Sequence, residues 1–202
     1  MKNNYIYDYI DAFEKVLSVG HQYHYSTTMI ERMISYSSFF WQIEKDNRGH
    51  SPIINDKTLI KEIYKDIEVD MNILPTYNQC LWAAESYLRI QGATRLSFEC
   101  IFLYIPIKEM YRYFPLYHEM DFSHIINRFN ELYNEESALS ILLNKYKYSL
   151  KDVSSKTGIS YETLYSLKKR RRDIKKISVE NLVRLANIFN VRIETIAEIE
   201  II

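Results

Sequence analysis

The amino-acid sequence predicts an all-α fold, and three observations support this prediction. Among its 202 residues there are only four glycines and four prolines, too few for the many tight turns of an all-β fold. Apolar residues recur every three or four positions along most of the chain, which places them on one face of a helix. The chain is 47% hydrophobic and contains 18 tyrosines, so it has enough apolar material to bury a core.

The apolar spacing predicts a series of helices in the first two-thirds of the chain. We expect them at residues 5–19, 27–45, 57–67, 76–91, 96–105, 106–114 and 122–133. Gly20 and Gly92 should end two of these helices and Pro115 a third, while Pro106 and Asp121 should begin the last two. The segment 96–105 fits a buried helix or a buried strand, and helix is favoured because a single strand would have no partner.

A polar segment at residues 134–137, Asn-Glu-Glu-Ser, separates two modules of opposite charge. Residues 1–135 carry 13 Lys and Arg against 18 Asp and Glu, a net charge of −5, whereas residues 136–202 carry 13 against 8, a net charge of +5. Eleven of the basic residues lie between Lys145 and Lys176, with three acidic residues among them. This concentration of cations is typical of a surface that binds phosphates, although a solvated charge run would have the same composition. We therefore expect two modules with different partners.

Residues 149–167 have the pattern of two short helices joined by a tight turn. Ser149 is a good N-cap and Asp152 follows it near the positive end of the helix. Gly158 can adopt the left-handed conformation that ends a helix, Ile159 is an apolar plug, and Ser160 can cap the next helix. This order of residues predicts a helix-turn-helix.

This stretch, Ser-Leu-Lys-Asp-Val-Ser-Ser-Lys-Thr-Gly-Ile-Ser-Tyr-Glu-Thr-Leu-Tyr-Ser-Leu, resembles the Cro/C1-type (XRE-like) helix-turn-helix family. The resemblance continues in Ser178-Val-Glu-Asn-Leu-Val-Arg-Leu-Ala-Asn-Ile-Phe-Asn-Val-Arg-Ile-Glu-Thr-Ile, which is similar to the fourth helix of the family and the start of the fifth. It covers roughly residues 136–199 and implies a five-helix DNA-binding domain at residues 136–202, after a helical module at residues 1–135.

The resemblance implies two sets of DNA contacts. The outward face of the second motif helix should read base edges, with the candidates Ser160, Tyr161, Glu162, Thr163, Tyr165, Ser166 and Lys169. Backbone phosphates should be bound by Ser149, Lys151, Lys168, Arg170, Arg171, Arg172, Lys175 and Lys176. Glu162 can accept from a cytosine amino group, and Thr163 and the tyrosines can contact thymine methyls.

Two residues depart from the family pattern. Many members have glutamine at the position of Leu150, where it often contacts the DNA backbone, and many have glycine at the position of Arg170. The first departure removes one phosphate contact, and the second suggests a changed loop after the recognition helix.

Other chemistries find little support in the sequence. Cys80 and Cys100 are expected to be reduced and buried. The cluster around His118, Glu119, Asp121 and His124 offers metal-ligand types without the spacing of a zinc peptidase, so we interpret it as a loop followed by a capped helix. His21 and His24 are expected in a solvated loop. A Gly-rich phosphate loop, a Gly-x-Ser-x-Gly motif and a CxxC pair are all absent from the sequence, so no enzyme, metal or cofactor is expected.

Two functional hypotheses follow from these observations. The first is a cytoplasmic, sequence-specific regulator that binds double-stranded DNA, a repressor or autorepressor. It would act as a homodimer formed through the N-terminal module or through the apolar tail, whose alternation also fits an edge strand: Ile193, Ile196, Ile199, Ile201 and Ile202. The alternative is an inhibitor of a nucleic-acid-handling enzyme, as in anti-CRISPR proteins or antitoxins of mobile elements, whose aromatic N-terminal module is the effector. No membrane span is expected.

Overall fold

The computed structural model describes residues 4–45, 75–171 and 177–198, and these form twelve helices and no strand. The prediction of an all-α fold is therefore confirmed for this part of the chain. We call the polar segment at residues 134–137 the hinge. The helices that begin before it are α1 (Asn4–Gln22), α2 (Thr27–Tyr36), α3 (Ser38–Lys45), α5 (Tyr77–Thr94), α6 (Phe98–Tyr104), α7 (Ile107–Tyr117) and α8 (Ser123–Glu135). Those after it are α9 (Ala138–Tyr146), α10 (Leu150–Thr157), α11 (Tyr161–Lys168), α12 (Val179–Phe189) and α13 (Ile193–Ala197). The helix expected at 57–67 lies outside the described residues.

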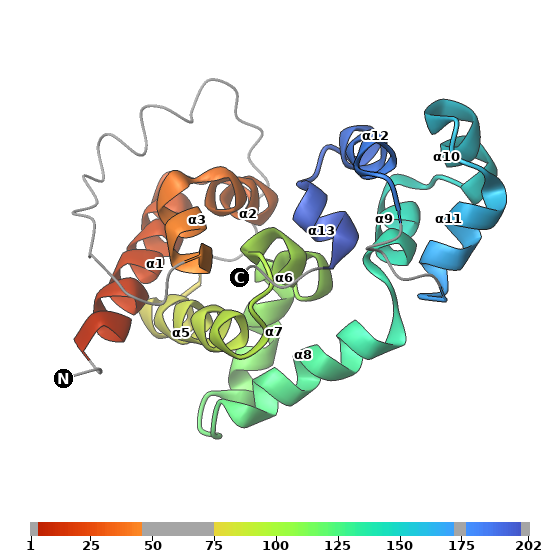
Figure 1. Cartoon of the computed structure of the whole chain (residues 1–202). Coiled ribbons are helices and arrows are strands. Elements are labelled where there is room, and N and C mark those ends of the chain that lie inside the picture. Colours follow the sequence, from red (N-terminus) through yellow and green to blue (C-terminus); the bar gives the residue numbers. More distant parts are fainter. Residues whose placement is uncertain (1–3, 46–74, 172–176, 199–202) are drawn as a thin grey trace.

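An aromatic core holds the first seven helices together. α1 packs along α5, and α2, α6 and α7 complete the bundle (Figure 1). The Phe13 ring is fully buried. Its centre lies 4.8 Å from the ring centre of Phe40, 5.8 Å from that of Tyr87 and 5.4 Å from that of Phe98, mostly in edge-to-face geometry. Such pairs stabilise a core beyond the area they bury. Many of the aromatic residues before the hinge are thus core residues.

Three expected helix ends were wrong. Gly20 lies inside α1, where a Cβ atom would come within 2.7 Å of the Ile30 side chain, so this glycine permits close packing of α2. Gly92 also lies inside a helix, because α5 continues to Thr94 and Arg95 takes the left-handed conformation after it. α7 runs through Pro115 to Tyr117, and the helix expected at 27–45 is divided at Ser37 into α2 and α3.

The expected Asp121 cap is not observed, because the N-cap of α8 is Phe122 and makes no side-chain capping bond. Two other local predictions are confirmed. The segment Phe98–Tyr104 is a helix capped by Ser97, and Cys80 and Cys100 are free and buried. His21 is the exception, because it lies within α1 and is 4% exposed instead of solvated. The apolar tail is helical at Ile193–Ala197, which excludes an edge strand there.

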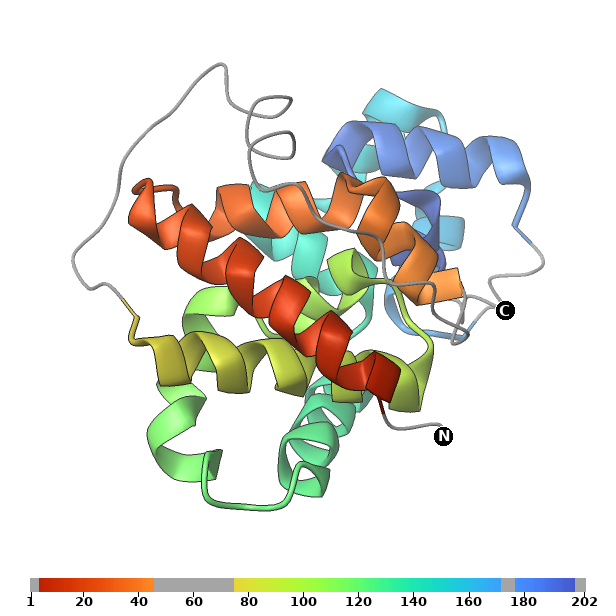
Figure 2. The same cartoon turned by 90° about the vertical axis from the view of Figure 1, so that its left-hand side faces the viewer.

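The last five helices form a second apolar cluster beside the first. Its centre contains the fully buried Val153, Leu164, Leu185 and Phe189. α6 packs against both α9 and α13, so these two helices lie between the first core and the rest of the second. α10 and α11 lie at the end of the molecule opposite α1 in Figure 1, and Figure 2 shows them behind α12, again away from α1.

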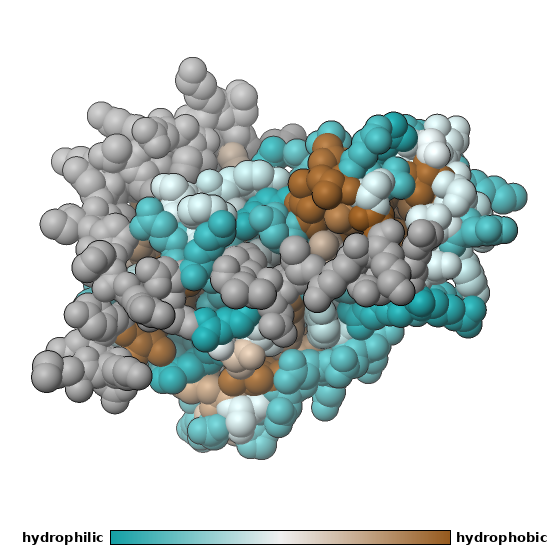
Figure 3. Space-filling view, in the orientation of Figure 1, coloured by the Kyte–Doolittle hydropathy of each residue, from teal (hydrophilic) through white to brown (hydrophobic). Residues whose placement is uncertain are grey.

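Apolar side chains also gather on one face over α12 and α13 (Figure 3). The exposed apolar residues of α12 are Val179 and Val183. Within the described residues, no helix combines the length and the apolar character that a membrane crossing requires.

Candidate nucleic-acid interface

The first helix of the motif, α10, begins with a complete capping box. The Ser149 hydroxyl accepts from the Asp152 amide at 3.2 Å, and the Asp152 carboxylate accepts from the Ser149 amide at 2.7 Å. The Ser149 hydroxyl also donates to the Asp152 carboxylate at 2.6 Å, and this bond, together with that from the Ser149 amide, holds the pKa of the exposed Asp152 carboxyl below its usual value. The start of the motif is therefore fixed by residues three positions apart in the sequence.

The turn between α10 and α11 is fixed by Gly158 and Ile159. Gly158 has a φ of +72°, a conformation that favours glycine, and its amide donates to the Ser154 carbonyl at 2.9 Å. The Ser154 hydroxyl donates to the Ile159 carbonyl at 2.6 Å, and the Ile159 side chain is buried. The predicted helix–glycine–plug–helix order is thus the observed one.

The second helix of the motif, α11, has one buried face and one exposed face. Ser160 caps it by accepting from the Thr163 amide at 3.3 Å, and Leu164 and Leu167 enter the core. On the other face, Tyr161 and Tyr165 are exposed, and their rings stack 6.3 Å apart with planes 14° from parallel. This face is neither packed inside the molecule nor covered by the N-terminal helices (Figure 1).

The structure brings the base-reading candidates together on this exposed face. Ser160, Tyr161, Glu162, Tyr165 and Lys169 are exposed, and Thr163 and Ser166 are half-buried. The Ser160 hydroxyl also donates to the Thr163 hydroxyl at 2.9 Å, so these two polar groups are held at the start of the helix.

The phosphate-binding candidates have three different placements. Ser149, Lys151, Arg170 and Arg171 are exposed, Lys168 is half-buried, and Arg172, Lys175 and Lys176 lie outside the described residues. The Arg171 guanidinium lies 5.9 Å from the centre of the Tyr165 ring, so it extends the stacked row of aromatic side chains. Leu150, the first departure from the family pattern, packs against the second core.

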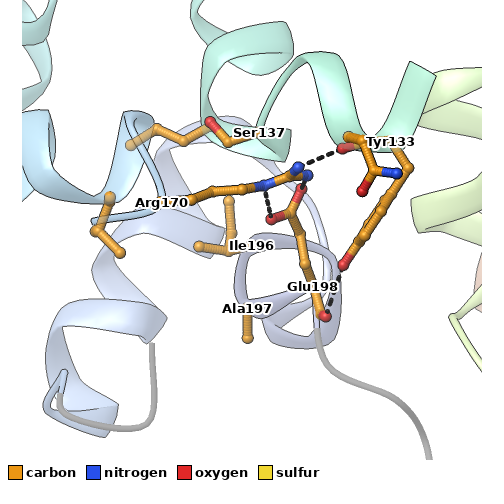
Figure 4. Close-up of a pocket in the computed structure, with 9 residues that line it drawn as sticks. Tyr133, Ser137, Arg170, Ile196, Ala197 and Glu198 are labelled. Atoms are coloured by element: carbon orange, nitrogen blue, oxygen red, sulfur yellow. Dashed lines mark hydrogen bonds and ion pairs between the residues drawn. The ribbon is translucent and has the colours of Figure 1, made fainter. Parts of the chain in front are cut away.

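Arg170 is placed apart from its basic neighbours. It follows α11 with a φ of +50°, a left-handed conformation that favours glycine, the residue that many family members have at this position. Its guanidinium turns back into the molecule and binds Glu198, with Nη2 2.7 Å from Oε1 and Nε 3.1 Å from Oε2 (Figure 4). This pair lies in the wall of a cavity of about 330 Å³ between α8, α9, α11 and α13. The phosphate contact of Arg170 stays a prediction.

Two polar clusters outside the motif show ordinary structural roles. Nδ1 of His118 donates to the Phe114 carbonyl at 2.8 Å, and Asp121 accepts from the Ser123 amide at 2.8 Å just before α8. His21 faces the Tyr111 hydroxyl, with 2.8 Å between Nε2 and the oxygen, and its burial lowers its pKa to about 4. No group of three or more His, Cys, Asp or Glu side chains suited to a metal ion occurs in the part of the chain that the structure describes.

The fold and the exposed face define a helix-turn-helix module of the kind whose second helix enters the major groove. Comparison with known families identifies it further: residues 138–200 match the model of the Cro/C1-type helix-turn-helix DNA-binding domain. The C-terminal third of the chain is therefore a Cro/C1-type domain, as its sequence predicted. No curated protein and no solved structure matches the chain significantly.

Proposed function

We propose that this protein is a cytoplasmic, sequence-specific regulator of transcription, a repressor or autorepressor that binds double-stranded DNA as a homodimer. The observation that carries the proposal is the exposed polar face of α11, with Tyr161, Glu162, Tyr165 and Lys169 open to solvent beside exposed basic residues. In this class of motif, the N-terminal part of the second helix meets base edges and the flanking cations meet phosphates.

The chemistry of this face suggests how it would read DNA. Glu162 can accept from the amino group of cytosine, and the Tyr161 and Tyr165 rings can contact thymine methyl groups. At the exposed tip of α11 there is no arginine, asparagine or glutamine to make a bidentate base contact. Discrimination by one copy would therefore be modest, and two copies on adjacent half-sites would supply the rest.

Binding of the full-length chain to a randomised pool of DNA duplexes, followed by sequencing of the retained duplexes, tests this function. Tyr161→Ala and Glu162→Gln should change which sequences are retained, because they alter base contacts. Arg171→Ala should weaken binding to all duplexes alike, because a phosphate contact carries no sequence information. Retention of no duplex by the wild-type chain would refute the proposal.

The exposed aromatic residues before the hinge support a second candidate. Tyr7, Tyr23, Tyr36, Trp41 and Tyr77 are exposed on a module whose net charge is −5. Exposed aromatics are enriched at protein interfaces, so this module could inhibit a basic, nucleic-acid-handling enzyme while the other regulates expression. A full-length Tyr161→Ala, Lys169→Ala double variant should then lose DNA binding and still inhibit that enzyme.

A further inference from the structure

We propose that Arg170 is a positioning residue that fixes the recognition helix to the N-terminal helices, and that it does not bind phosphate. The proposal deepens the proposed function, on which its DNA-binding part rests. It starts from the backbone at the end of α11. The amides of Arg170 and Arg171 donate to the carbonyls of Leu167 and Ser166, both at 2.9 Å, which is the Schellman arrangement.

This turn reverses the direction of the chain and aims the Arg170 side chain at the hinge. Besides its two bonds to Glu198, the guanidinium donates to the Tyr104 hydroxyl at 3.0 Å and to the Tyr133 carbonyl. It also lies 4.6 Å from the centre of the Tyr133 ring. Arg170 therefore joins the end of α11 to α6 and to the end of α8.

The carboxylate of Glu198 is bound as closely as the guanidinium. Its Oε1 accepts from the Ala138 amide at 2.6 Å, at the N-terminus of α9, and from the Tyr104 hydroxyl. The Glu198 side chain is only 13% exposed. A neighbouring hydrogen bond also joins the end of α11 to the start of α9, because the Ser137 hydroxyl donates to the Lys168 carbonyl at 2.9 Å. Elements from both sides of the hinge thus converge on one ion pair.

These contacts leave the guanidinium little capacity for a DNA phosphate. An arginine has five N–H donors, and four of those of Arg170 are directed at Glu198, Tyr104 and Tyr133, which leaves one Nη1 proton. The pair instead holds the recognition helix in one orientation relative to the first seven helices. DNA binding would then not require this helix to be ordered at the moment of contact.

The test uses the full-length chain and the duplex that the wild type selects from the randomised pool. Affinity is measured by fluorescence anisotropy over a series of KCl concentrations. Arg170→Gly removes the guanidinium and suits the left-handed backbone, Glu198→Gln removes the partner charge and retains Arg170, and Arg171→Ala is the matched control for a phosphate ligand.

Arg170→Gly and Glu198→Gln should each weaken binding about tenfold without changing the slope of log affinity against log salt. Arg171→Ala should reduce the magnitude of that slope by about 0.9, the value for one lost phosphate contact. The proposal is overturned if Arg170→Gly reduces the slope as Arg171→Ala does while Glu198→Gln keeps full affinity. It is also overturned if neither Arg170→Gly nor Glu198→Gln weakens binding.

Amide hydrogen exchange supplies a readout that needs no DNA. In Arg170→Gly and Glu198→Gln, residues 161–170 should exchange faster than in the wild type, and unchanged exchange in both overturns the proposal. If the wild-type chain selects no duplex, the proposed function fails, and the exchange comparison alone decides the role of Arg170.

Discussion

Two adjacent arginines show how strongly local geometry decides what one residue can do. Arg170 and Arg171 belong to the same basic run, and composition alone gives them the same role. The left-handed backbone of Arg170 directs its guanidinium to Glu198, whereas the Arg171 guanidinium lies over the Tyr165 ring. Charge density in a sequence therefore does not tell which cations form ion pairs within the chain.

His21 gives a prediction for the dependence of stability on pH. Burial lowers the pKa of His21 from 6.5 to about 4. Between these two pH values the histidine is therefore protonated in the unfolded chain and neutral in the folded chain. Stability should therefore decrease as the pH falls from about 6.5 to about 4, by up to about 3 kcal/mol in total. The measurement is urea unfolding of the wild type and of His21→Gln at several pH values.

The difference between these two proteins isolates the histidine from an opposing group. Burial raises the pKa of Glu31 to about 7, so the stability that its protonated form contributes is lost as the pH rises through that value. This contribution is common to both proteins and cancels in the difference. If the free energy of unfolding depends on pH in the same way in the wild type and in His21→Gln, His21 does not titrate in this way.

At the scale of elements, three glycines have three different roles. Gly158 ends α10 in the left-handed conformation, and Gly20 lies against Ile30 inside α1. Gly92 lies in α5, where an added methyl group would meet no atom within 4 Å. One amino-acid type thus serves a turn, a close helix contact and an ordinary exposed helical position.

Alanine substitutions at these glycines should change stability in opposite directions. Gly158→Ala should cost about 1–2 kcal/mol because of the backbone, and Gly20→Ala about 1–2 kcal/mol because its methyl group would overlap Ile30. Gly92→Ala should instead stabilise by about 0.5–1 kcal/mol, because alanine favours the helix. Thermal unfolding followed by circular dichroism measures all three, and a destabilising Gly92→Ala would contradict this assignment of roles.

These glycines also show what could be predicted from the sequence. The helix-turn-helix was predicted because its caps and its turn depend on residues two to five positions apart, such as Ser149 with Asp152 and Ser154 with Ile159. Gly20 was misassigned because its role depends on Ile30, which belongs to the next helix. The pairing of Arg170 with Glu198 joins residues far apart in the sequence, and no local pattern indicates it.

At the scale of the whole molecule, a second ion pair holds the two apolar clusters together. Nη1 of Arg192, just before α13, lies 2.8 Å from the fully buried Glu44 carboxylate at the end of α3. The other Glu44 oxygen accepts from the Phe98 amide at 2.6 Å, and the Arg192 amide donates to Glu99 at 2.7 Å. Both Glu44 oxygens are thus paired, and one of these bonds crosses the boundary predicted at residue 135, while Nη2 of Arg192 is buried without a hydrogen-bond partner among the described residues.

Removal of Arg192 should therefore separate the unfolding of the two clusters. Both tryptophans, Trp41 and Trp82, lie before the hinge, so fluorescence reports the first cluster while far-ultraviolet circular dichroism reports all helices. In the wild type the two urea transitions should coincide, because the paired charges and the α6–α9 and α6–α13 contacts make one cooperative unit.

Arg192→Ala leaves the Glu44 carboxylate buried without its partner and should cost about 3–5 kcal/mol. Since this carboxylate belongs to α3, the fluorescence transition should move to lower urea than the circular dichroism transition. Glu180→Gln, which breaks the exposed pair with Arg184 on α12, is the matched control and should cost less than about 1 kcal/mol. Coincident transitions in Arg192→Ala at wild-type urea concentrations would mean that apolar packing alone joins the two clusters.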